Sequence, residues 1–358
     1  MFNKLILVIT MMGISASAFS STDYFDDSDI SGNYPAIRVE SPQLSPDGIE
    51  EYDFASGYSV EVLRYDHGNY RVIEGLPIVA QAGFGEEEVI QTDGMGFAGS
   101  TNCSPGSTIR LTAVLQSEHF YISNDSNIYT VVQDVRCGKH TRILFGQETA
   151  SGQAIGIWQV ARLAEVKLSQ AVDLAFWRTP TRFIWPADSD YYSRGTVHIS
   201  RGDHWDVVGH EMGHAIYSAA GIGASEGGQH YIDRCYSGTM ALSEGWASYF
   251  SAWVNLDLSD PDARFEYMVP RRAPIRFENI PADVCKGSAN EWRVTGFFWD
   301  LIDLNNDGEN VNETFATLWN ALLNGRSRDS RAAANKIVRA GVSQDLVNLS
   351  WMLNFQEN

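Results

Sequence analysis

Residues 207–215 read VVGHEMGHA and place two histidines, His210 and His214, four positions apart. Apolar residues recur around them at helical spacing, and Asp203 precedes them as a candidate helix N-cap. Because residues four apart share one face of a helix, the two imidazoles can converge on a single metal ion. Glu211 then lies beside the coordination position that the protein leaves open. The stretch predicts a helix that carries part of a metal site.

The glycines of this helix predict a second helix packed closely against it. Gly209 and Gly213 are also four apart, and each costs about 1 kcal/mol relative to alanine within a helix. Close approach of another helix would offset that cost, and residues 242–250, LSEGWASYF, supply a candidate with an apolar face. Glu244 lies near that face, where a carboxylate needs a partner. Since His, His and Glu form a standard zinc ligand set, Glu244 completes a site for one catalytic Zn²⁺. Two alternatives stay open: Glu244 as an ordinary surface residue, and the histidines as a structural pair without metal.

Residues 207–215 and residues 243–246, SEGW, together resemble the glutamate-liganded zinc peptidases, or gluzincins, a group that includes thermolysin and fungalysin. The Glu-Gly-Trp stretch is closer to fungalysin, and the resemblance covers residues from about 180 to 305. It implies a mostly helical zincin-type domain with a small mixed β-sheet, whose edge strand at residues 196–200 receives an extended peptide. It also implies a general base, Glu211, and three zinc ligands, His210, His214 and Glu244.

Two features depart from the pattern of these relatives. Ser248 stands where they carry an aspartate that orients a zinc-bound histidine. A hydroxyl is a weaker acceptor, so we expect lower metal affinity unless another carboxylate, such as Asp206, takes that place. Downstream of the metal-binding helices, the relatives also carry a histidine, which stabilises the transition state. The last histidine of this chain is His230, before the second of these helices.

Arg293 is the predicted replacement for that missing histidine. It precedes Gly296 by three residues, as the histidine does in fungalysin, and an arginine can donate two hydrogen bonds to an oxyanion. A structural salt bridge of Arg293 with Glu291 or Asp300 is the alternative, and it is left open. Further candidates for substrate contacts are His230, Tyr231 and Tyr236.

The N-terminal half has a different pattern. Short alternating runs, at residues 58–63, 108–114 and 128–132, are separated by turns as in a β-sandwich. The turn at residues 92–96 resembles those of transthyretin-like or carboxypeptidase-regulatory-like modules. After Gly152 the period becomes helical. The sequence thus predicts an α+β chain with a β-sandwich-like module at 57–148 and a metallopeptidase domain at 149–358.

The first residues predict export. Lys4, an apolar run at residues 5–12 and the small residues before position 19 are typical of a signal peptide at 1–18, cleaved near Ala18. The run is shorter than the roughly 20 residues that span a bilayer, so we expect no membrane span. Residues 19–56 are acidic and read as a linker or pro-segment.

Four cysteines form an even set in a chain that is expected to be exported, which favours two disulfides over free thiols. Two of them fall in the strand-rich half and two in the helix-rich half. We therefore expect Cys103 to pair with Cys137 and Cys235 with Cys285. No C-x-x-C pair is present, which disfavours a cysteine-liganded zinc site.

Charge and one loop complete the sequence-based expectations. The formal net charge of −19 makes nucleic acid an unfavourable partner. Residues 303–308, DLNNDG, match the opening of a Ca²⁺ loop, but the twelfth position is Thr314 and Glu313 stands one place early. A helix stop is the competing interpretation of that loop.

The function expected from these features is that of a secreted zinc metallopeptidase acting on protein or peptide substrates. Glu211 would remove a proton from a zinc-bound water as that water attacks the peptide carbonyl. One alternative is a zinc amidase acting on a non-protein amide such as a cell-wall crosslink. Another is an inactive secreted binding protein that uses its β-module, against which the intact Glu211 argues.

Overall fold

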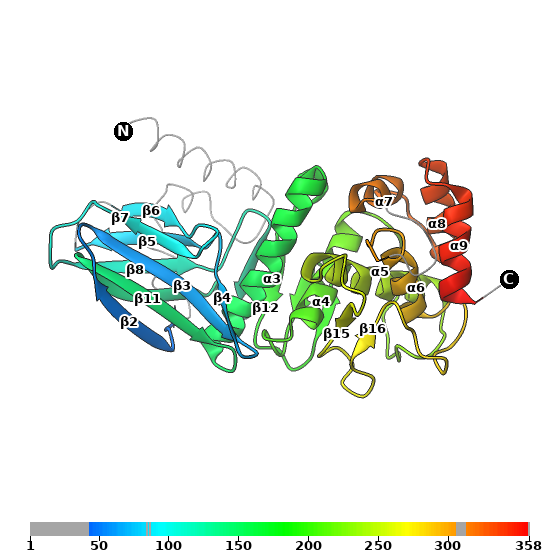
Figure 1. Cartoon of the computed structure of the whole chain (residues 1–358), viewed down its shortest axis with the longest axis horizontal. Helices are drawn as coiled ribbons and strands as arrows, with labels where there is room; N and C mark the ends of the chain where they lie inside the picture. The colour runs from blue at the N-terminus through cyan, green and yellow to red at the C-terminus, as the bar shows by residue number, and fades with distance from the viewer. Residues whose placement is uncertain (1–42, 84, 86, 306–312, 357–358) are drawn as a thin grey trace. The chain divides into compact units, whose positions relative to one another are not determined.

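The computed structural model describes residues 43–83, 85, 87–305 and 313–356 (Figure 1). Two compact units make up the chain. Unit 1 holds the residues up to Arg162 together with Thr179–Ser189 and His198–Asp203, and unit 2 holds Leu163–Arg178, Asp190–Val197 and the chain from His204 onward. The chain passes from unit 1 to unit 2 inside helix α3 (Ala150–Ala171) rather than at the predicted boundary before residue 149.

Unit 1 contains two β-sheets of five strands each, which confirms the β-rich half of the predicted α+β fold (Figure 1). Burial alternates along residues 58–62, where Val60 and Val62 point into the core with almost no exposure. One sheet has the order β1-β10-β8-β5-β6: Gln43–Leu44, Thr130–Arg136, Thr108–Val114, Pro77–Ala82 and Glu87–Gln91. The other has the order β2-β11-β3-β4, with β7 also on β3: Gly48–Asp53, Lys139–Gly146, Tyr58–Asp66, Asn69–Val72 and Phe97–Ser100.

The sandwich begins earlier than the sequence indicated. Strands β1 and β2 lie within the segment that was expected to be a linker, where β1 pairs with β10 and β2 with β11. The predicted turn at residues 92–96 is present, because Asp93 Oδ1 accepts hydrogen bonds from the main-chain N–H of Met95 and Phe97. The expected signal peptide and the first part of the expected linker, residues 1–42, lie outside the described residues.

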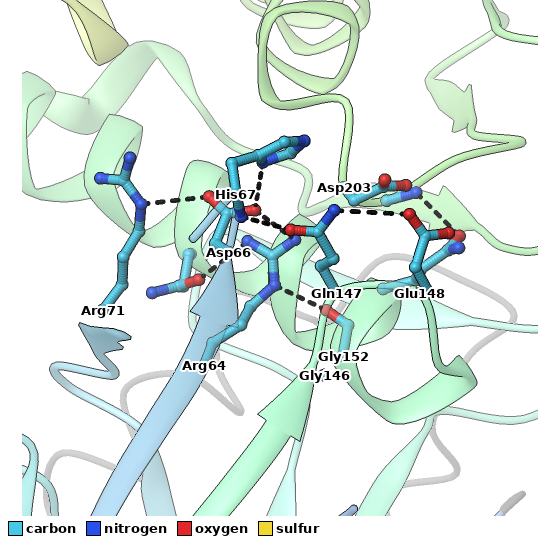
Figure 2. A network of polar contacts seen from close by, with 12 residues as sticks. Arg64, Asp66, His67, Arg71, Gly146, Gln147, Glu148, Gly152 and Asp203 are labelled. Atoms are coloured by element: carbon cyan, nitrogen blue, oxygen red, sulfur yellow. Dashed lines mark hydrogen bonds and ion pairs between the residues drawn. The ribbon is translucent and has the colours of Figure 1, made fainter. Parts of the chain in front are cut away.

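A buried polar network joins strand β3 to the first turns of α3 (Figure 2). Arg64 is 3 % exposed; its Nε donates to Gly152 O at 2.9 Å, and its Nη2 lies 3.3 Å from Asp66 Oδ1. Asp66 also accepts from Arg71 Nε at 3.1 Å. On the same unit, Asp47 Oδ2 accepts from Ser151 Oγ at 2.9 Å. The beginning of α3 is therefore an integral part of unit 1.

Two further strands of unit 1 form a parallel pair outside the sandwich, β9 (Phe120–Ser123) and β12 (Thr181–Ile184). Strand β13 (Tyr191–Ser193), in unit 2, is hydrogen-bonded to β14 (Thr196–His198), which begins in the same unit. The sequence predicted an edge strand at residues 196–200. In the structure this strand is paired with β13, and β13 is the strand at the end of the sheet.

Unit 2 is mainly helical, as expected (Figure 1). Its helices are the end of α3, then α4 (Trp205–Ala219), α5 (Gly238–Asn255), α6 (Glu291–Trp299), α7 (Phe315–Leu322), α8 (Ser330–Arg339) and α9 (Gln344–Phe355). A 3₁₀ turn, Leu174–Phe176, and a two-stranded sheet, β15 (Arg264–Phe265) with β16 (Ile275–Arg276), complete it. Trp246 and Tyr249 of α5 pack against Phe298 of α6 in an aromatic core.

Glycines bring these helices close together. A Cβ on Gly213 of α4 would lie 2.8 Å from Ala247 Cα of α5, and one on Gly245 would lie 2.5 Å from Val294 Cβ of α6. Side chains larger than hydrogen would push the helices apart. The prediction that a second helix offsets the cost of the α4 glycines is consistent with these contacts.

Both predicted disulfides are present. Cys103 pairs with Cys137 in unit 1, and Cys235 pairs with Cys285 in unit 2. Among the described residues, none of the helices is long and apolar enough to cross a bilayer.

Candidate metal centre

Helix α4 presents the motif residues on its buried face. It begins at Trp205 with His204 as its cap, one residue later than the Asp203 cap expected from the sequence. Asp203 instead accepts hydrogen bonds from Arg201. His210, Glu211 and His214 are all less than 10 % exposed. The helical spacing thus gives the shared face that the sequence predicted.

Three ligand-type atoms converge between α4 and α5. His210 Nε2 lies 3.2 Å from Glu244 Oε2, His214 Nε2 lies 3.1 Å from the same oxygen, and the two Nε2 atoms lie 3.1 Å apart. Zinc bonds of about 2.0–2.2 Å at tetrahedral angles separate ligand atoms by about 3.3 Å. The triangle formed by these atoms fits one such ion, with a fourth position left for water or substrate.

Hydroxyl groups orient both imidazoles. His210 Nδ1 lies 3.0 Å from Ser248 Oγ, and His214 Nδ1 lies 3.5 Å from Ser243 Oγ. With the Nε2 atoms facing the cluster, the Nδ1–H of His210 donates to Ser248. Each nitrogen of the His210 ring therefore has a partner: Nε2 faces the cluster and Nδ1 bonds to Ser248.

Asp206 does not take that place. Its Oδ2 accepts hydrogen bonds from the main-chain N–H of Glu266, Tyr267 and Met268, and its Oδ1 accepts from that of Val207. This carboxylate anchors residues 266–268 to the start of α4. The suggestion that Asp206 substitutes for the missing aspartate is therefore corrected.

The two carboxyl groups of the motif are in different electrostatic environments. Burial raises the pKa of Glu211, and His210 and His214 oppose this effect without cancelling it. Burial also raises the pKa of Glu244, but the same two histidines outweigh it and hold that pKa well below its ordinary value. Glu244 is thus the carboxylate that stays ionised, as a metal ligand would have to be, and Glu211 is the more basic of the two, as a general base would have to be.

His230 joins the cluster from the loop between α4 and α5, and Glu291 joins it from the first turn of α6. His230 Nε2 lies 3.1 Å from Glu291 Oε2 and 3.6 Å from Glu244 Oε2. Its Nδ1 lies 3.0 Å from Gly228 O, which can only accept, so Nδ1 carries a proton. The close pair of Nε2 and Glu291 then shares a second proton.

Electrostatics agree with a shared proton in this pair. Burial raises the pKa of Glu291 to about 8. Burial lowers the pKa of His230, but the charges of Glu291 and Glu244 outweigh it, and the net pKa is raised. Sequence reasoning named His230 as a candidate for substrate contacts, and as one of three alternatives to Arg293 as oxyanion donor, but named Glu291 only as a partner of Arg293. No helical spacing connects the two residues, so no sequence pattern could have paired them.

Arg293 is not brought to this cluster. The side chain is 1 % exposed, and its guanidinium donates to three main-chain carbonyls, those of Cys285, Asn354 and Val284, at 2.7, 2.6 and 3.0 Å. The sequence offered two roles for Arg293, an oxyanion donor and a salt bridge with Glu291 or Asp300. The structure shows neither, because the guanidinium donates to these main-chain carbonyls instead. Arg293 ties the segment before α6 to the end of α9.

The remaining candidates are aromatic or lie outside the described residues. Tyr231 is exposed and lies under the guanidinium of Arg271, and Tyr236 accepts a hydrogen bond from the Tyr231 N–H. Tyr192 of β13, which sequence reasoning missed, stacks on His214 with ring centroids 6.4 Å apart. The Ca²⁺ loop that begins at Asp303 continues into residues 306–312, outside the described part of the chain, so that expectation stays a prediction.

Comparison with known families adds one finding. Residues 164–338 match the family model of the Mycolysin C-terminal domain. This match links the chain to metallopeptidases of the fungalysin and thermolysin type, and the matched range contains every residue of the cluster described above. No curated protein matches the chain.

Proposed function

We propose that the chain is a secreted zinc peptidase in which His210, His214 and Glu244 hold one zinc ion. The observation that carries this proposal is the triangle of two Nε2 atoms and one carboxylate oxygen with sides of 3.1–3.2 Å. The similarity of residues 164–338 to a mycolysin domain supports peptide-bond hydrolysis as the reaction. The two disulfides are typical of proteins that fold in an oxidising compartment, which supports secretion.

Each motif residue then has a distinct role. When bound, zinc supplies a water whose pKa is lowered toward about 7 and polarises the substrate carbonyl. Glu211 would accept a proton from the attacking water and would pass it to the leaving amine nitrogen. Ser248 keeps the Nε2 atom of His210 directed at the cluster by accepting its Nδ1–H.

His230 replaces Arg293 as the proposed oxyanion donor. It lies next to the Glu244 oxygen on the partly exposed side of the cluster, and the proton that its Nε2 shares with Glu291 would be the one donated to the oxyanion. A donor aimed at the developing oxyanion typically contributes about 10²–10³ in rate. The neighbouring strand β13, whose Tyr192 stacks on His214, is the proposed place for an extended substrate.

Metal analysis and hydrolysis together test this function. The mature chain should contain one zinc ion, cleave peptides from a mixed library, lose cleavage on chelation and regain it when zinc is returned. Cleavage of a cell-wall crosslink but no peptide would favour the amidase alternative. Stoichiometric zinc without any hydrolysis would favour a binding protein.

A further inference from the structure

We propose that the Cys235–Cys285 disulfide is a positioning element for His230 and not only a general brace for unit 2. The inference rests on the proposed function, because it assigns His230 a part in the reaction. Residues 221–237, here called the His230 loop, connect α4 to α5 and contain no helix or strand of their own. Residues 224–229 of the loop are exposed, so few side chains pack against that side of it. The loop therefore needs anchors elsewhere to keep an imidazole in place.

The anchors lie just after His230. They consist of the Cys235–Cys285 disulfide and the hydrogen bonds around it, and this group is here called the clamp. The Cα atoms of Cys235 and Cys285 are 5.7 Å apart. Beside the bond, the main-chain N–H of Cys285 donates to Asp233 O at 3.0 Å, and that of Tyr236 donates to Ala289 O at 2.9 Å. The covalent bond thus sits within a short ladder of main-chain hydrogen bonds.

Asn290 extends the clamp to the helix that carries Glu291. It is fully buried, and its Nδ2 donates to both Ile232 O and Arg234 O at 2.8 Å. Its Oδ1 accepts from the N–H of Arg293 and so caps α6. One side chain therefore fixes the His230 loop and the first turn of α6 together. Glu291, the partner of His230, directly follows Asn290 in the chain.

Arg293 holds the other side of the disulfide. Its Nε and Nη2 donate to the carbonyls of Cys285 and Val284. The buried arginine that the sequence suggested as a catalytic group is therefore part of the support for the clamp.

The clamp and the metal ligands belong to different elements. His210 and His214 come from α4 and Glu244 from α5, while the clamp joins the loop between these helices to the segment before α6. Loosening the clamp should therefore displace His230 and leave the ligand triangle intact. A displacement of about 1 Å can cost roughly 10²-fold in rate.

The test uses the full mature chain with paired serine substitutions. The variant Cys235→Ser/Cys285→Ser opens the clamp, and Cys103→Ser/Cys137→Ser, which opens the disulfide of unit 1, is the matched control. Both variants lose an unfolded-state constraint, so both should melt at lower temperature. At a temperature well below both transitions, we expect one zinc per chain in each. Only opening the clamp should lower kcat, by roughly 10²-fold, with KM changed little.

A double-mutant comparison separates positioning of His230 from other effects. His230→Ala should lower kcat by roughly 10²–10³. Adding the two serine substitutions to His230→Ala should lower it no further, because the clamp acts through that imidazole. A second readout needs no activity: in metal-free protein, amide hydrogen exchange in residues 224–236 should quicken when the clamp opens and stay unchanged in the control.

Three results would overturn the proposal. The first is an unchanged kcat in Cys235→Ser/Cys285→Ser, and the second is that these substitutions lower the kcat of His230→Ala by the same factor as that of wild type. The third is an unchanged rate of amide hydrogen exchange in the loop. If the serine variant fails to fold, Asn290→Ser replaces it, since serine keeps the α6 cap and removes the two amide donors. A wild-type chain that binds no zinc or cleaves nothing would refute the proposed function, while the exchange comparison would still decide whether the clamp holds the loop.

Discussion

The imidazole of His210 donates its Nδ1–H to the hydroxyl of Ser248, 3.0 Å away, so a neutral side chain orients this candidate metal ligand. The Ser248 hydroxyl also faces Met268 Sδ at 3.9 Å, a weak acceptor for its proton. Met268 in turn is fixed through its main-chain N–H by Asp206. The arrangement holds the ring without adding a negative charge next to the candidate metal ligands.

Ser248→Ala should therefore weaken zinc binding by roughly 10- to 100-fold, the usual effect of losing such a partner. Ser248→Asp should restore or strengthen binding, because a carboxylate is the stronger acceptor. Competition with a chromogenic chelator measures both affinities. Ser350→Ala is the control: its buried hydroxyl donates to Phe297 O, outside the cluster. Equal zinc affinity in Ser248→Ala and wild type would exclude this role.

Glu211→Gln should keep zinc and lower peptide hydrolysis by about 10²–10⁴, because the residue is proposed as a base and not as a ligand. Glu244→Ala should lose zinc and activity together. Zinc content by mass spectrometry, set beside single-turnover rates, distinguishes the two variants. Near-normal hydrolysis by Glu211→Gln would remove it from the mechanism.

Gly213→Ala should destabilise the chain by about 1–3 kcal/mol, because its new methyl group would meet the backbone of α5. The nearest atoms, Ala247 O and Cα, lie only 2.7 and 2.8 Å from the Cβ position. Gly227→Ala is the matched control, since nothing lies within 4 Å of its Cβ position. Denaturant titrations of the metal-free proteins measure the difference. Equal losses in both variants would mean that helix contact does not limit position 213.

Arg293→Met should cost more than about 2 kcal/mol of stability, because three buried carbonyls lose a charged donor. Zinc content per folded molecule should not change. Arg293→Lys should recover part of the stability, as lysine keeps a charge but not the forked geometry. A large loss of turnover at unchanged melting temperature would instead return Arg293 to the role of oxyanion donor.

Asp233 predicts a dependence of stability on pH. Hydrogen bonds from Arg271 hold its pKa at about 2, below the ordinary value of 3.8. A lowered folded-state pKa contributes stability above the ordinary value, and this contribution is lost as the pH falls from about 4 toward 2. The melting-temperature difference between wild type and Asp233→Asn, both metal-free, should thus be present at pH 7 and shrink below pH 4. A constant difference down to pH 2 would contradict this assignment.

The sequence by itself determined the features that rest on local periodicity. The spacing of His210 and His214 places them on one helix face whatever the surroundings, and the apolar stripe around Glu244 turns that residue inward. Strand alternation indicated the β-sandwich for the same reason, because the two-residue period of a strand is local. The disulfide pairing followed from the division of the chain into strand-rich and helix-rich halves.

Only the tertiary structure decided how groups distant in sequence combine. His230 reaches Glu291 because a disulfide and Asn290 hold an irregular loop, and loops carry no periodicity from which a direction could be predicted. Arg293 and Glu291 stand two positions apart on α6, so they point to different neighbours, and the choice between them depended on packing. The position inside α3 at which the chain passes from one unit to the other could not be predicted either. A continuous helix gives no sequence signal at the residue where its contacts change from one unit to another.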